Sequence, residues 1–151
     1  MARRGPKTDQ QFRYWHMVRT GKNQADIARE HGVSRQAVSK AVQTAEREVV
    51  FQLLDTAQMS GVLVEWYDAR LGILIGITPQ LGNLACILVI DVAYRPRLFF
   101  DQSQNTDVDV VMRTMEDIRE VLSLAIGLEL DHGATFKDII DRIVKQKRTG
   151  G

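Results

Sequence analysis

The feature that most constrains the fold is a change in hydrophobic period at Ser60-Gly61. Before it, residues 35–59 contain neither proline nor glycine, and apolar residues recur every three or four positions, as on one face of a helix. This stripe consists of Val42, Ala45, Val49, Leu53 and Ala57. After it, β-branched and aromatic residues recur at every second position over 62–67 and 73–78, which is the period of a strand. We therefore expect an α+β chain, helical at first and β-rich after residue 60.

Four segments after residue 60 have the composition of strands and are separated by turn residues. They are residues 62–67, 73–78, 84–90 and 97–101. The first two read as a hairpin, the third is continuously apolar like a central strand covered on both faces, and the fourth follows Pro96 like an edge strand. Helical stripes lie over about 106–128 and from Phe136 onward. The sequence thus predicts a small antiparallel sheet of three or four strands covered by one or two helices.

Three helices are predicted before residue 60. The first begins after a cap at Thr8 or Asp9 and ends near Arg19, the second covers 24–31, and the third covers 35–59. The predicted domains are residues 1–59, a DNA-binding head with an extended third helix as connector, and residues 60–151, an α+β module for oligomerisation or sensing. The stripe on the third helix is interpreted as either core or a dimer seam.

The segment from Gln24 to Gln43 satisfies the steric requirements of two helices joined by a tight turn. Ala28 is small where the helices touch, Gly32 tolerates the left-handed backbone of the turn, and Ser34 caps the next helix. The apolar residues expected to lock the crossing are Ile27, Val33, Val38 and Ala41.

Position for position, this segment resembles the helix-turn-helix of prokaryotic transcription regulators. It is similar to sigma-factor region 4 and to archaeal Tfx-type DNA-binding heads, whereas no family is recognised beyond about residue 55. The resemblance implies a three-helix head that binds double-stranded DNA. A winged-helix arrangement, with residues 62–78 as the wing, is an alternative that the long preceding helix disfavours.

The charge distribution agrees with this expectation. Residues 1–48 carry ten Lys and Arg against five Asp and Glu, whereas residues 49–151 carry ten against fourteen. A basic first third on an acidic remainder is typical of a nucleic-acid-binding head attached to another module.

The resemblance also implies roles for individual residues, because a recognition helix places its first turns in the major groove. The expected base-reading residues are Arg35, Gln36, Ser39 and Gln43. The expected phosphate-binding residues are Lys22, Gln24, Ser34 and Lys40, together with Arg3, Arg4 and Lys7 of a basic N-terminal arm that could enter the minor groove.

The function predicted from sequence is sequence-specific transcription regulation by a dimer or higher oligomer. The expected partners are double-stranded DNA, further copies of the chain and a small-molecule effector. No catalytic, cofactor or metal motif is found, and the longest apolar run, Leu84–Ile90, is too short to cross a bilayer. We therefore expect a cytoplasmic non-enzyme. The alternatives are an architectural, partition or replication protein of a virus or plasmid, and a ligand-binding or enzyme-accessory protein.

Overall fold

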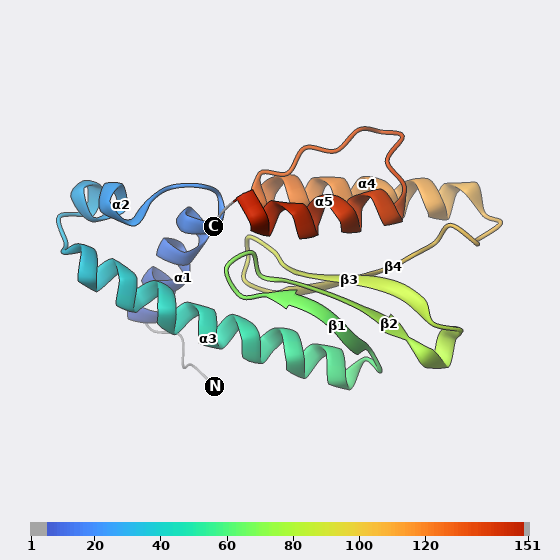
Figure 1. Cartoon of the computed structure of the whole chain (residues 1–151), viewed down its shortest axis with the longest axis horizontal. Helices are drawn as coiled ribbons and strands as arrows, with labels where there is room; N and C mark the ends of the chain where they lie inside the picture. The colour runs from blue at the N-terminus through green and yellow to red at the C-terminus, as the bar shows by residue number, and fades with distance from the viewer. Residues whose placement is uncertain (1–5, 150–151) are drawn as a thin grey trace.

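The computed structural model describes residues 6–149 and confirms the α+β class (Figure 1). Over these residues the chain forms five α-helices and one four-stranded antiparallel sheet. The helices are α1 (Pro6–Arg19), α2 (Gln24–His31), α3 (Arg35–Met59), α4 (Val108–Ile126) and α5 (Phe136–Thr149). The strands are β1 (Leu63–Asp68), β2 (Ile73–Thr78), β3 (Leu84–Ile90) and β4 (Pro96–Phe100), with a short 3-10 helix, η1 (Pro79–Leu81), between β2 and β3.

The sheet is a meander in which consecutive strands pair in the order β1-β2-β3-β4. Its strands begin and end within one residue of their predicted positions. β3 lies between β2 and β4, where Leu88 is opposite Leu74 on one side and Leu98 on the other. The continuously apolar run is therefore a central strand, as predicted, and its last five residues are buried.

Helices cover both faces of this sheet, because successive side chains of a strand point to opposite faces. The face toward α1 and α3 presents Leu74, Cys86, Leu88 and Ile90. The face toward α4 and α5 presents Ile73, Ile75, Ile87 and Val89. In Figure 1, α4 and α5 lie together above the sheet and α3 runs along its lower side. We refer to these two surfaces as the α3 face and the α4–α5 face.

The apolar stripe of α3 is core. Val49 and Leu53 are fully buried and belong to the same hydrophobic cluster as Leu88 of β3. The interpretation of the stripe as a dimer seam is therefore wrong, because α1 and the sheet that forms later in the chain together cover it. That cluster also joins residues on both sides of the predicted boundary at residue 59.

The start of α1 differs from the sequence prediction. The helix begins at Pro6, so neither Thr8 nor Asp9 stands before it as a cap. Proline suits the first turn of a helix, since the amide hydrogen it lacks would have no partner there. The bounds of α2 and α3, in contrast, are those predicted.

A polar joint fastens α1 to the sheet. The indole Nε1 of Trp15 donates a hydrogen bond to the carbonyl of Ala69 in the β1–β2 turn, at 3.0 Å. Arg19 is only 4% exposed, and its Nη1 donates to the carbonyls of Leu71 (3.3 Å) and Ile90 (2.6 Å). Its guanidinium also lies over the Trp15 ring, 4.2 Å from the centroid. No sequence pattern predicts this joint, which orients the hairpin against the N-terminal helices.

The joint leaves no space for a larger residue at Gly72. This glycine has a φ of +71°, and a Cβ built there would lie 2.8 Å from two Trp15 ring carbons.

Burial lowers the pKa of Arg19 to about 10, so its side chain is still a cation at neutral pH. The carbonyl oxygens around it compensate for its removal from water.

Candidate nucleic-acid interface

The turn between α2 and α3 has the local geometry expected from its sequence. Asn23 caps α2, its Oδ1 accepting from the amide of Asp26 at 2.8 Å. Gly32 ends α2 with a φ of +64°, in the left-handed region. Ser34 caps α3, its Oγ accepting from the amide of Ala37 at 3.0 Å. Both ends of α2 and the start of α3 are therefore capped by residue types that favour those positions.

Of the four apolar residues expected to pack between α2 and α3, three do so and Val33 does not. Ile27 and Val38 are fully buried and Ala41 is half-buried, all packed in or against the cluster of the α3 face. Val33, in contrast, is 38% exposed, so its predicted role as a lock at the crossing is wrong. It follows Gly32 directly, and the left-handed turn leaves its side chain at the surface.

The predicted base-reading residues lie on the first half of α3. Arg35, Gln36 and Gln43 are exposed and Ser39 is half-buried. Arg35, Ser39, Gln43 and Glu46 follow one another by four, four and three residues, which aligns them along one side of the helix. We call these four residues the polar strip of α3. Within residues 6–149, Arg35 forms no ion pair, so its guanidinium is available to a ligand.

The predicted phosphate-binding residues differ in their availability. Lys40 is exposed and, among the residues that the structure describes, makes no ion pair. Lys22 is also exposed, but its Nζ lies 2.6 Å from Oε1 of Glu30, and this hydrogen bond lowers the pKa of the Glu30 carboxyl. Ser34 accepts the capping bond and retains its hydroxyl hydrogen as a donor. Gln24 is half-buried at the first turn of α2.

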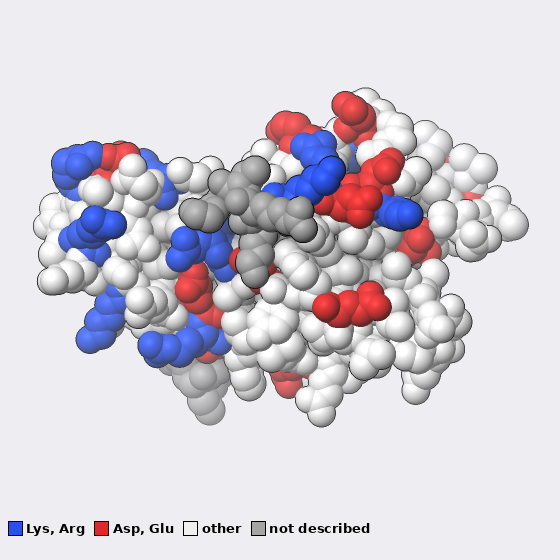
Figure 2. Space-filling model, in the orientation of Figure 1, with Lys and Arg blue, Asp and Glu red and all other residues white. Residues whose placement is uncertain are grey.

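The predicted basic arm lies largely outside the described residues. Arg3 and Arg4 precede them, and Lys7 belongs to the first turn of α1, with its side chain outside the described part. Within the described part, Figure 2 shows Lys and Arg side chains over the end of the molecule formed by α2 and the first half of α3. On the opposite half, Asp and Glu side chains lie among Lys and Arg side chains over α5. On this face of the molecule, the end formed by α2 and α3 therefore carries mainly basic side chains.

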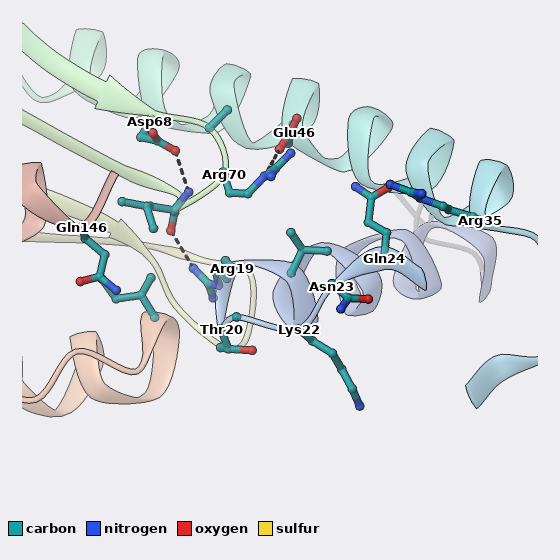
Figure 3. A pocket seen from close by; sticks show the side chains of 15 residues that line it. Arg19, Thr20, Lys22, Asn23, Gln24, Arg35, Glu46, Asp68, Arg70 and Gln146 are labelled. Carbon is teal, nitrogen blue, oxygen red and sulfur yellow. Dashed lines mark hydrogen bonds and ion pairs between the residues drawn. The ribbon is translucent and has the colours of Figure 1, made fainter. Parts of the chain in front are cut away.

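A groove of about 1030 Å³ lies between this end and the sheet (Figure 3). Lys22 lines it from the α1–α2 loop and Gln24 from α2. Arg35 and Glu46 line it from α3, and Arg70 lines it from the β1–β2 turn. The structure therefore brings two predicted phosphate-binding residues and one predicted base-reading residue to the same hollow. It does not place Gln43 there, since that residue lines a second hollow of about 450 Å³ on α3.

Sequence reasoning missed Arg70. Its Nε donates to Oε2 of Glu46 at 3.0 Å, which links the β1–β2 turn to α3. A single arginine in a hairpin turn has no local sequence signature, since such turns are usually polar and solvent-exposed. Only the return of the strand along α3 places it beside the polar strip.

Other reactive side chains have structural surroundings. Nδ1 of His16 accepts from Nε of Arg19 at 3.0 Å, and burial together with the Arg19 charge lowers the pKa of His16. Burial raises the pKa of Cys86, as expected for an inert thiol in a central strand. Over residues 6–149 no three His, Cys, Asp or Glu residues group as metal ligands, and no helix is both long and apolar enough to cross a membrane.

Neither a protein-family model, nor a curated protein, nor a solved structure matches this chain.

Proposed function

We propose that this chain is a sequence-specific double-stranded DNA-binding transcription regulator that inserts the first half of α3 into the major groove. The observation that carries the proposal is a set of non-acidic polar side chains on a helix held by a capped turn: Arg35, Gln36, Lys40 and Gln43 are exposed, and Ser39 between them is half-buried. An α-helix fits the width of the major groove, and polar side chains there can read the base edges.

The polar side chains of α3 can form hydrogen bonds with the base edges in the major groove. Arg35 can donate two hydrogen bonds to guanine O6 and N7, and Gln36 and Gln43 can each pair with adenine N6 and N7. Ser39 can donate to or accept from either base. Because Arg35 has no carboxylate partner within the described chain, binding DNA would not require an ion pair at this side chain to be broken.

Lys40 and the N-terminus of α2 are suited to the phosphates on either side. The first amides of α2 point out of the helix end, and the helix dipole favours an anion there. Lys22 lies in the loop just before this end, and its ammonium is paired with Glu30 of the last turn of α2. These contacts would set the orientation of α3 on the duplex without reading its sequence.

We also propose that the regulator acts as a dimer, and exposed apolar side chains on α3 and on an edge strand support this. Phe51 is 63% exposed on α3, and Leu63 and Tyr67 are 58% and 42% exposed on opposite faces of β1, an edge strand that contacts α3. The other edge, β4, begins with Pro96 and Arg97, which discourage pairing. Pairing of two β1 edges about a two-fold axis would present two recognition helices, and would predict two half-sites about 34 Å apart or a multiple of that.

Selection from a random DNA library with the purified full chain tests the proposal. We expect an enriched two-part motif, and Arg35→Ala should lose about 1–3 kcal/mol on that motif and relax one base position in each half-site. Arg113→Ala is the matched control, since Arg113 is an exposed arginine on α4, far from α3 in sequence.

The alternatives give different results. Tight binding with no enriched motif would favour an architectural protein, whereas no salt-dependent DNA binding at all would exclude both DNA-binding functions. Light scattering tests the dimer separately: the expected mass is twice 17.1 kDa, and Leu63→Lys should reduce it to one chain. A monomer that binds a single half-site with full affinity would overturn the dimer.

A further inference from the structure

The β1–β2 turn lies beside the polar strip of α3. Strand β1 runs back along α3, so the turn at residues 68–72 reaches Glu46, three residues after Gln43. Ala69 lines one hollow with Gln43 and Arg47, and both Ala69 and Arg70 line the groove with Lys22 and Arg35. The turn therefore separates two hollows, each of which also contains a residue with a predicted DNA contact.

The guanidinium of Arg70 has N–H donors that make no hydrogen bond within the described residues. Its side chain is 50% exposed, and the only hydrogen bond it makes within residues 6–149 uses Nε, toward Glu46. A guanidinium carries five N–H donors in a planar fork, so the two Nη groups are left for another acceptor. The Glu46 carboxylate is less exposed, at 22%, and fixes the plane of this fork.

Two arginines from different elements line the groove, so they can contact an anion that extends beyond one contact. Arg35 lies on α3 and Arg70 lies on the hairpin, whereas the Lys22 side chain points away from both and pairs with Glu30 (Figure 3). A phosphodiester backbone is such an anion, because its charges repeat along the strand. A guanidinium can donate two parallel hydrogen bonds to one phosphate.

We propose that Arg70 is a phosphate-binding residue, and that the β1–β2 turn grips the DNA backbone beside the recognition helix. This inference rests on the proposed function and adds a second element, distant in sequence, to the interface. Glu46 acts as a positioning residue: it orients the Arg70 fork and leaves both Nη groups toward the strand. The turn can hold this position because Trp15 and Arg19 fasten it to α1.

The test is a salt titration of binding to a fluorescein-labelled duplex of about 30 bp that carries the motif selected by the wild-type chain. Arg70→Ala should reduce the slope of log K against log salt by ~0.9, the value for one lost phosphate contact. Arg70→Lys should restore most of the slope, because a lysine retains the charge although not the fork. Arg113→Ala, the control, should leave the slope unchanged.

Glu46→Gln separates a phosphate contact from a purely structural role. It removes the ion pair but keeps the Arg70 cation, and it removes a negative charge beside the DNA. We expect the slope of Glu46→Gln to equal that of the wild type. An equal loss of slope in Glu46→Gln and Arg70→Ala would show that the ion pair only braces the hairpin, and would overturn the inference.

The two proposals fail in distinguishable ways. If the wild type selects no motif and shows no salt-dependent binding, the proposed function itself fails. If the wild type and the Arg35→Ala variant behave as expected but Arg70→Ala keeps the full slope, only the assignment of Arg70 is wrong. Thermal unfolding of each variant, which should give a melting temperature close to that of the wild type, confirms that the fold persists.

Discussion

The two faces of the sheet are covered by different kinds of contact. The α4–α5 face is lined by aliphatic side chains and Phe99, packed against helices whose buried residues, such as Ile118, Leu122 and Ile139, are also apolar. The α3 face has a comparable aliphatic stripe, and it adds the polar joint of Trp15 and Arg19. Apolar packing is non-directional, whereas hydrogen bonds and ring contacts fix orientation. The α3 face thus combines stability with the placement of the candidate interface.

This comparison predicts that damage at the joint affects both stability and DNA binding. The largest effect is expected for Gly72→Ala, because the new Cβ would meet the Trp15 ring and alanine is strained at a φ of +71°. We expect a loss of about 2–4 kcal/mol in the free energy of unfolding, measured with urea. Gly133→Ala is the control, since a Cβ there meets nothing within 4 Å. Equal free energies of unfolding for the two variants would contradict the close packing of Gly72 against Trp15.

Trp15→Phe and Phe136→Leu compare the faces directly. Trp15 is fully buried on the α3 face, and its loss removes ring volume and leaves the Ala69 carbonyl without its donor, at a cost of about 2–3 kcal/mol. Phe136 is buried on the α4–α5 face and its shortening should cost about 1–2 kcal/mol.

Only the Trp15 variant should also weaken DNA binding, since it frees the hairpin that carries Arg70. Fluorescence anisotropy at a temperature where both variants are folded gives the answer. A similar loss of affinity in both would mean that the two faces contribute equally to the interface.

Lys40→Ala compares a lysine on the α3 side of the molecule with one on the α4–α5 side. Lys40 is exposed on α3 and should bind a phosphate, so its removal should lower the salt slope of DNA binding by ~0.9 and leave the selected motif unchanged. Lys137→Ala, an exposed lysine on α5, is the matched control on the α4–α5 side. A changed motif would instead assign base reading to Lys40.

The smallest effect concerns pH. Burial and Arg19 lower the pKa of His16 in the folded chain, so the unfolded chain binds a proton more readily. The stability that neutral His16 supports is complete above the unfolded pKa of about 6.5 and declines as the pH falls below it. Urea unfolding at several pH values should show this decline in the free energy of unfolding, and the decline should be smaller in His16→Gln. The same pH dependence in both proteins would show that His16 does not contribute to the joint.

Much of the fold could be predicted because its determinants are local. Asn23, Gly32 and Ser34 act on their own turns, so the bounds of α2 and α3 follow from the sequence around them. The strands were equally predictable, since a period of two and flanking turn residues are both visible over a few positions. The exposed residues of α3 also follow from helical spacing once the helix is known, which is why Arg35, Lys40 and Gln43 were found.

One error arose where a distant segment supplies the partner, and another arose where the geometry of a turn decides exposure. The stripe of α3 has the same pattern whether it packs on a sheet or on a second chain, and the sequence contains no feature that distinguishes them. Val33 has the residue type of a core position, but the turn geometry leaves it exposed.

The amino-acid sequence by itself determined the α+β class, the order of the elements, the capped turn between α2 and α3 and the polar side chains that α3 exposes, because these depend on neighbours within one or two turns of chain. The tertiary structure alone decided that the α3 stripe is core, that Trp15 and Arg19 fasten the hairpin, and that Arg70 lies beside the polar strip. These features join residues 24 to 71 positions apart, such as Arg70 with Glu46 and Arg19 with Ile90. Contacts at such separations form only when the whole sheet folds against the helices, and no local periodicity records them.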